Sequence, residues 1–197
     1  MKRVVLLGDS IRQGYEPAVR AQLADVAYVW SPADNGQHSV NLLLNFWSWV
    51  VTQQPDVLHL NAGLWDMRRA VRNHPGNVIP LESYRANVDH LLSLAKQHTS
   101  ACIIWATTTP IHHDHANITH FRKGLAGRDG ADVALYNAAA IEVARRHNVR
   151  INDLHQVVTE ASPDRLLDAD GVHFTAPGFE ILGHAVARCI RDVLAAH

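Results

Sequence analysis

The stretch VVLLGDSIRQG, residues 4–14, decides the expected fold. Its first four residues form an apolar run with the length of a strand that is buried on both faces. Gly8 ends this run, and Asp9 and Ser10 lead into more polar sequence. Two interpretations of Ser10 are open on these residues alone. It either caps the helix that follows, by satisfying free backbone N–H groups, or acts as a nucleophile at the end of the strand.

Apolar runs alternate with helix-period segments along the rest of the chain. Further strands are predicted at residues 26–30, 56–63, 102–107 and 149–153, and helices at residues 39–51, 81–98, 132–147 and 176–194. This alternation predicts an α/β fold, with a parallel sheet of about five strands and helices on both faces. Residues 108–130 are expected to form a long irregular rim. A single domain over residues 1–197 is expected from the length.

Composition and charge narrow the classes of partner. The net charge is −1, with 18 basic and 19 acidic residues, so neither a nucleic acid nor an anionic membrane is predicted as a partner. No apolar stretch approaches the ~20 residues of a membrane span. The apolar run after Lys2 and Arg3 is shorter than that of a secretory signal. Cys102 and Cys189 lie in apolar segments and are expected to be free thiols, which favours a cytoplasmic protein.

Polar residues near the two ends of the chain form the candidate site. In a parallel sheet, ligands bind at the carboxyl ends of the strands, where Ser10 follows the first strand. Asp170 and His173 lie three residues apart, with Gly171 between them, just before the last helix. At this spacing an Asp can orient the ring of a His and stabilise its charged form. Each motif alone is common, whereas the two together favour nucleophilic catalysis over capping.

These motifs, GDSIRQG (residues 8–14) and DADGVHFTAPGFEILG (residues 168–183), resemble those of the GDSL/SGNH hydrolase family. The resemblance extends over almost the whole chain, because the order of strands and helices also fits. It implies a three-layer α/β/α, flavodoxin-like fold. It also implies that Ser10 is the nucleophile, His173 the base and Asp170 its partner, and that the N–H groups of Ser10 and Gly36 contribute to the oxyanion hole.

The third motif departs from the family pattern. The pattern G-x-N-D maps onto Gly63–Asp66 and puts Trp65 where the family has an Asn whose side chain completes the oxyanion hole. Asn61 lies two residues before Gly63 and would share its strand face. A bend at Gly63 would be needed to bring it into place, and we expect Asn61 to supply the missing donor. Asp9 and Trp65 are expected to contact the substrate.

Two other groups of residues are given structural roles. His112, His113, Asp114, His115 and His120 have metal-ligand chemistry but no helical i, i+4 pair in a segment expected to be irregular, so no metal site is predicted. Core packing is the expected role of Trp47, Trp49 and Trp105.

The predicted function is that of a serine ester hydrolase that needs no cofactor. The expected substrate is a small-molecule or carbohydrate ester with a short acyl group, and an acetylated carbohydrate is preferred. Thioester or lysophospholipid hydrolysis is the alternative within the same chemistry. A non-catalytic binding module is supported only by the departure at Trp65. A flavodoxin-like nucleotide binder is disfavoured because the turn at residues 8–14 has no glycine-rich phosphate cradle.

Overall fold

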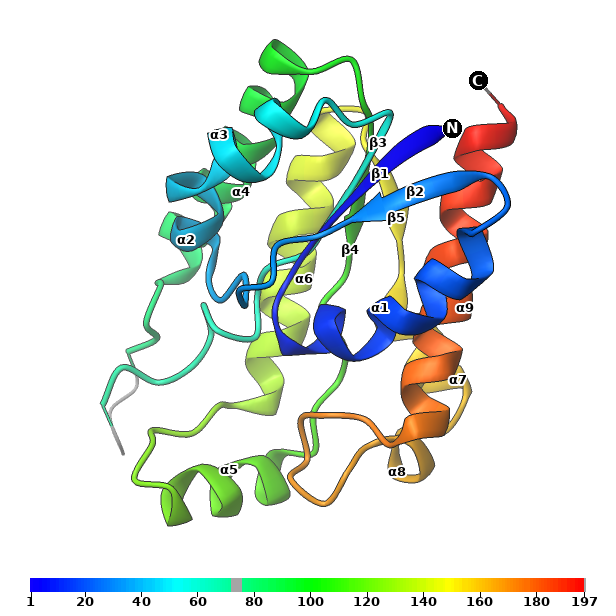
Figure 1. The fold of residues 1–197 in the computed structure, drawn as a ribbon. Helices are drawn as coiled ribbons and strands as arrows, with labels where there is room; N and C mark the ends of the chain where they lie inside the picture. Colours follow the sequence, from blue (N-terminus) through cyan, green and yellow to red (C-terminus); the bar gives the residue numbers. More distant parts are fainter. Residues whose placement is uncertain (72–75, 197) are drawn as a thin grey trace.

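The computed structural model describes residues 1–71 and 76–196, and within them a single parallel sheet lies at the centre (Figure 1). Its five strands are β1 (Lys2–Leu7), β2 (Ala27–Trp30), β3 (Val57–Leu60), β4 (Cys102–Ala106) and β5 (Arg150–Asn152). Their order across the sheet is β2-β1-β3-β4-β5. The five-stranded parallel sheet is confirmed.

The direction in which successive strands are added to the sheet reverses between β1 and β3. The chain leaves β1 towards β2 on one side, whereas β3, β4 and β5 are added on the other side. At such a switch point the loops after the two central strands diverge and leave a crevice. The loop after β1 carries Ser10, and the loop after β3 carries residues 61–66.

Both faces of the sheet are buried, as the apolar run in β1 predicts. Val4 and Leu6 belong to the hydrophobic core on one face. Val5 and Leu7 belong to the core on the other face. All four side chains are fully buried, so helices are needed on both sides of the sheet.

The helices form the two outer layers (Figure 1). The layer that covers Val4 and Leu6 contains α1 (Ser10–Leu23), α7 (Leu154–Glu160) and α9 (Ala176–Ala195). The opposite layer contains α2 (Ser39–Leu44), α4 (Leu81–His98) and α6 (Gly130–Arg146). The three-layer α/β/α architecture is therefore confirmed.

The rim at the carboxyl ends of the strands is more ordered than the sequence suggests. Residues 108–130, expected to be irregular, contain the helix α5 (His113–Arg122). The ring of His112 caps this helix by accepting from the His115 amide at 3.4 Å. Histidine is an uncommon cap, so the usual capping pattern did not mark the start of α5. The short helix α8 (Pro163–Leu166) follows α7.

The apolar segment at residues 39–51, predicted as one well-covered helix, is broken into α2, α3 (Phe46–Trp49) and the 3₁₀ turn η1 (Val51–Gln53). The break lies at Asn45, where the Asn41 carbonyl accepts from both the side-chain amide of Asn45, at 2.9 Å, and its backbone amide, at 3.2 Å. Leu44 is 79% exposed and Trp47 is 61% exposed. The prediction that Trp47 packs in the core is therefore wrong, whereas the same prediction is confirmed for Trp105, which is fully buried.

Two further expectations concern the cysteines and the helices. Cys102 and Cys189 are both free thiols, as expected. Among the described residues, no helix combines the length and the apolar character that a membrane crossing requires.

Candidate active site

Asp9, rather than Ser10, caps helix α1. One carboxylate oxygen of Asp9 accepts a hydrogen bond from the Ile11 amide at 2.9 Å. This contact satisfies one of the free N–H groups at the start of the helix. The Ser10 hydroxyl is thus available for another partner, and the interpretation of Ser10 as the helix cap is wrong.

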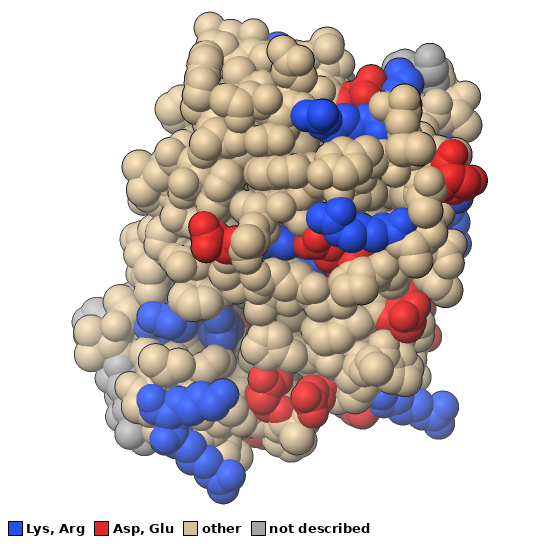
Figure 2. Space-filling view, viewed as in Figure 1, with Lys and Arg blue, Asp and Glu red and all other residues tan. Residues whose placement is uncertain are grey.

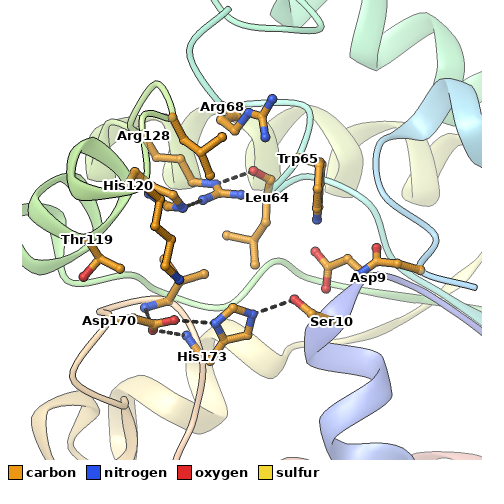
Figure 3. Close-up of a pocket in the computed structure, with 14 residues that line it drawn as sticks. Asp9, Ser10, Leu64, Trp65, Arg68, Thr119, His120, Arg128, Asp170 and His173 are labelled. Atoms are coloured by element: carbon orange, nitrogen blue, oxygen red, sulfur yellow. Dashed lines mark hydrogen bonds and ion pairs between the residues drawn. The ribbon is translucent and has the colours of Figure 1, made fainter. Parts of the chain in front are cut away.

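That partner is His173, which in turn contacts Asp170 (Figure 3). Ser10 Oγ lies 2.8 Å from His173 Nε2, and His173 Nδ1 lies 2.5 Å from Asp170 Oδ2. An ionised carboxylate only accepts hydrogen bonds, so the proton on the ring belongs on Nδ1. Nε2 is then free to accept the proton of the Ser10 hydroxyl.

A tight loop before α9 holds the Asp170–His173 pair. Gly171 has a φ of +74°, a conformation that favours glycine. A Cβ at this position would lie 2.7 Å from the Ala116 amide nitrogen and 2.8 Å from the His112 carbonyl oxygen. Thr175 then caps α9 by accepting from the Gly178 amide at 3.4 Å. These contacts fix the loop at both ends. The three-residue spacing of Asp170 and His173 then brings the two side chains within hydrogen-bond distance.

Close packing of α1 against α9 brings the two ends of the chain together. Gly183 of α9 faces Ala18 of α1, and a Cβ at Gly183 would lie 2.5 Å from the Ala18 Cβ. The absence of a side chain here lets the two helix backbones approach each other. Ser10 at the start of α1 and His173 just before α9 therefore meet.

The hydrogen bonds around Asp170 keep its carboxyl group ionised. Partial burial alone would raise its pKa, but the bonds from the His173 ring and from the backbone amides of His173 and Val172 hold the pKa below the ordinary value. The two amides lie 2.8 Å and 2.9 Å from Asp170 Oδ1. A fixed negative charge at Asp170 can stabilise a positively charged imidazole at His173.

A cavity of about 240 Å³ opens over these three residues. Asp9 and Trp65, both expected to contact substrate, also line it. The remaining lining residues come from the loops and from α5 (Figure 3): Asn35, Leu64, Arg68, Thr119, His120, Lys123, Leu125, Arg128 and Val172. The sequence did not indicate that Arg68, Lys123 and Arg128 line the cavity, because no motif links these three basic residues to the strand ends.

Arg128 is the most buried of these basic residues, at 6% exposure. Its Nε donates to the Leu64 carbonyl at 2.5 Å, and its Nη1 lies 2.9 Å from His120 Nε2. Burial lowers the pKa of Arg128 to about 10, so the side chain remains a cation at neutral pH. Burial and the charge of Arg128 lower the pKa of His120 to about 4. His120 is therefore neutral and accepts from Arg128.

The carboxyl group of Asp9, which caps α1, is buried beside several positively charged side chains. Its carboxyl group is 1% exposed, and Oδ2 has no hydrogen-bond partner among the described residues. Burial raises the pKa of Asp9, while the Ile11 amide and the charges of Arg128, His173 and Arg12 oppose that rise. Asp9 thus lies beside the cavity as a weakly solvated acid.

Gly36 does not have the role that the resemblance implies. Its amide donates to the Gly8 carbonyl at 2.9 Å, which engages the N–H assigned to the oxyanion hole. A Cβ at Gly36 would lie only 2.5 Å from that carbonyl oxygen. Gly36 therefore permits a close approach of two backbones beside the site, and the expected oxyanion contact is corrected to this structural one.

Asn61 is also corrected. Its side-chain amide donates to the Ala106 carbonyl at 2.8 Å. The chain does turn at Gly63, where φ is +151°, but Asn61 lies before that turn. Asn61 lines a separate, much smaller cavity with Tyr15 and Thr107. The Ala106 carbonyl thus engages one N–H of Asn61, and Asn61 does not line the cavity over Ser10, so the structure does not support the expected oxyanion contact.

The His-rich segment has hydrogen-bonding and stacking roles. His112 caps α5 and stacks on His115, with 3.8 Å between the ring centres. His113 Nδ1 accepts from the Gly130 amide at 3.2 Å. In the parts of the chain that the structure describes, no group of three or more His, Cys, Asp or Glu side chains is arranged to hold a metal ion.

Several solved structures share this fold. A lipase/acylhydrolase from Enterococcus faecalis is 23% identical, with a TM-score of 0.79, and the match covers 98% of this chain and 96% of that chain. An acetylxylan esterase from Geobacillus stearothermophilus is 20% identical, with a TM-score of 0.77 and coverage of 95% and 93%. A GDSL-like lipase from Bacteroides thetaiotaomicron is 22% identical, with a TM-score of 0.75 and coverage of 98% and 89%.

Family membership comes from the sequence. No curated protein sequence matches the chain at a significant level. The model of the GDSL-like lipase/acylhydrolase family, in contrast, matches residues 6–181, which include Ser10, Asp170 and His173. The chain therefore belongs to the GDSL-like lipase/acylhydrolase family of carboxylic ester hydrolases.

Proposed function

We propose that this protein hydrolyses short-chain acyl esters, with Ser10 as nucleophile, His173 as base and Asp170 as the group that orients the base. The observation that carries this proposal is the chain of hydrogen bonds from Ser10 through His173 to Asp170, at 2.8 Å and 2.5 Å. A nucleophile within reach of a base that a third group orients is the arrangement that acyl transfer requires.

The reaction has two halves. Ser10 Oγ attacks the ester carbonyl while His173 Nε2 accepts the hydroxyl proton. The resulting tetrahedral intermediate collapses, the alcohol leaves with the proton from His173, and an acyl-enzyme remains on Ser10. Water then attacks the acyl-enzyme, with His173 again taking and returning a proton. The products are the free acid and Ser10 in its original state.

The negative oxygen of the intermediate needs hydrogen-bond donors. The Ser10 amide is the first N–H of α1, and the amides at a helix start have no partner within the helix. Together with the positive end of the helix dipole, this amide favours an oxyanion beside Ser10. In this proposal the Ser10 amide is the oxyanion donor, because the Gly36 amide and the Asn61 side chain donate to backbone carbonyls instead.

The preferred substrate is an acetyl ester of a small molecule or carbohydrate. The cavity of about 240 Å³ supports a small acyl group. The related fold of an acetylxylan esterase from Geobacillus stearothermophilus is consistent with this choice.

A panel of p-nitrophenyl esters from acetate to decanoate tests the proposal, with wild type and Ser10→Ala measured side by side. We expect the highest kcat/KM for acetate. Ser10→Ala should lower kcat by about 10⁴-fold or more, because only binding and oxyanion contacts remain. Ser48→Ala is the matched control, since Ser48 is exposed in α3. Undiminished hydrolysis by Ser10→Ala would reject the mechanism, and a maximum at decanoate would reject the short acyl group.

A further inference from the structure

Arg68, Lys123 and Arg128, which all line the cavity, carry more positive charge than the acidic residues of the site balance. Three cationic side chains line the cavity together with two carboxyl groups, Asp9 and Asp170. His120 is neutral, and His173 acts as a base in its neutral form. The excess of at least one positive charge would be balanced by a monoanionic ligand.

Building on the proposed ester hydrolysis, we infer that the natural substrate is an ester that carries a carboxylate, and that Arg68 and Lys123 bind this carboxylate. The ester carbonyl would lie at Ser10, and the carboxylate would lie against the opposite wall. Figure 3 shows Arg68 and Arg128 on the side of the cavity away from Ser10 and His173.

The first argument is that, within the described part of the chain, these cations form no close ion pair with an acidic side chain. Arg12 pairs with Glu16 at 2.6 Å, which is how this protein neutralises a buried arginine elsewhere. Among the described residues, by contrast, no carboxylate oxygen lies within 4 Å of a charged nitrogen of Arg68, Lys123 or Arg128. A cation without a partner beside a cavity is available to an anionic ligand.

The second argument concerns the orientation of Arg68. Its guanidinium carbon lies over the Trp65 ring, 5.2 Å from the ring centre, so a cation–π contact with the indole helps to position the group. The N–H groups of a guanidinium lie in its plane, and they match the two oxygens of a carboxylate. Arg68 Nε is buried and has no hydrogen-bond partner among the described residues. At least this one donor of Arg68 is therefore without a partner in the described part of the chain.

Lys123 and Arg128 have different roles in this site. Lys123 is exposed at the end of α5, where a flexible side chain can reach a ligand at the mouth of the cavity. Arg128 is nearly buried and uses donors on Leu64 and His120, so it adds a fixed positive field. Figure 2 shows that basic side chains gather over α5 at this end of the molecule, next to a group of acidic side chains.

The test compares esters that differ in charge but hardly in shape. 4-Acetoxybenzoate carries a carboxylate on the alcohol half, and 4-acetoxybenzamide is its neutral counterpart. Monoethyl succinate and ethyl succinamate place the same difference on the acyl half. We expect kcat/KM to favour the carboxylate at least about 10-fold in one of the two pairs, and the pair that responds identifies the half that carries the charge.

Arg68→Gln and Lys123→Gln should each reduce this preference about fivefold or more. Arg122→Gln is the matched control, because Arg122 is an exposed arginine of α5 that does not line the cavity, and it should keep the preference. Since Lys123 is exposed, Lys123→Gln tests the inference even where Arg68→Gln fails to fold. Sodium chloride at 0.5 M should also weaken the preference, because salt screens the attraction.

The possible failures are separable. Equal kcat/KM within both pairs, with hydrolysis that depends on Ser10, would overturn the anionic substrate and leave the proposed function intact. An unchanged preference in both Arg68→Gln and Lys123→Gln would overturn the assigned residues. Hydrolysis that persists in Ser10→Ala would overturn the proposed function itself.

Discussion

Ser10 Oγ lies 2.8 Å from His173 Nε2, although 163 residues separate the two in the chain. The contact is made where α1 begins and just before α9 begins, and the close packing of these two helices maintains it. The geometry of the site thus depends on the stability of one layer of the fold. Substitutions of the site residues should therefore lower activity without unfolding the protein, whereas substitutions between α1 and α9 should lower activity by moving Ser10 and His173 apart.

Asp170→Asn tests the role of the negative charge next to His173. An amide can still accept from the backbone amides of Val172 and His173, so the loop is expected to fold. It cannot stabilise a charged imidazole in the same way, and we expect kcat to fall about 10²–10⁴-fold. Asp168→Asn is the control, because this exposed residue lies in the same loop and does not line the cavity. Equal losses in both variants would indicate damage to the loop rather than loss of the charge.

Asn61→Ala separates a structural role from an oxyanion role. Because the Asn61 amide donates to the Ala106 carbonyl, we expect kcat to stay within about threefold of wild type. An oxyanion donor would instead cost about 10²–10³-fold in kcat. The free energy of unfolding should fall by about 1–3 kcal/mol, because a half-buried carbonyl loses its partner. Steady-state kinetics and urea denaturation measure the two effects, and a 100-fold loss of kcat with unchanged stability would contradict the structure.

Trp65→Ala should mainly affect substrate binding. Trp65 lines the cavity and packs against Arg68, so its removal should raise KM about 5- to 10-fold and broaden the range of acyl chains accepted. Trp65→Phe keeps an aromatic face and should retain most of the binding. Figure 3 shows the indole nitrogen directed towards the side of the cavity with Asp9 and Ser10. A fall in kcat with unchanged KM in both variants would therefore contradict this prediction and assign the indole N–H to the oxyanion.

Asp66 should make the stability of the fold depend on pH. Burial raises its pKa to about 7, against the opposing hydrogen bonds from Ser39. Between the pKa of an unfolded Asp, about 4, and that of the folded state, the folded protein binds more protons. Stability from this group is therefore complete below about pH 4 and is lost as the pH rises through 7, by up to about 1.4 kcal/mol per pH unit.

Asp66→Asn removes this titration while keeping an oxygen that accepts from Ser39. Urea denaturation of both proteins between pH 4 and pH 8 measures the difference. We expect wild-type stability to fall more steeply with pH than that of the variant, and the exposed Asp34→Asn should follow wild type. Parallel curves for wild type and Asp66→Asn would show that the carboxyl group of Asp66 titrates near its ordinary value.

The pattern of residues along the chain predicts the α/β class, the five strands and the three residues that hydrogen bonds connect in the candidate site. Buried strands consist of continuous apolar runs, and the residue types of the Gly-Asp-Ser and Asp-x-x-His motifs indicate the chemistry that we propose. Helices fixed by unusual local contacts were not found in this way. The cap on α5 by His112 and the break at Asn45 depend on side-chain hydrogen bonds that propensity does not encode.

Only the folded chain shows which hydrogen-bond donors remain available and which charges line the cavity. Gly36 and Asn61 occupy the expected regions of sequence, but the carbonyls of Gly8 and Ala106 take their hydrogen bonds. Arg68, Lys123 and Arg128 line one cavity only because the loop after β3 and the segment around α5 meet at the carboxyl ends of the strands. Hydrogen bonds and charges act over a few ångströms in space, whereas sequence patterns record only neighbours along the chain.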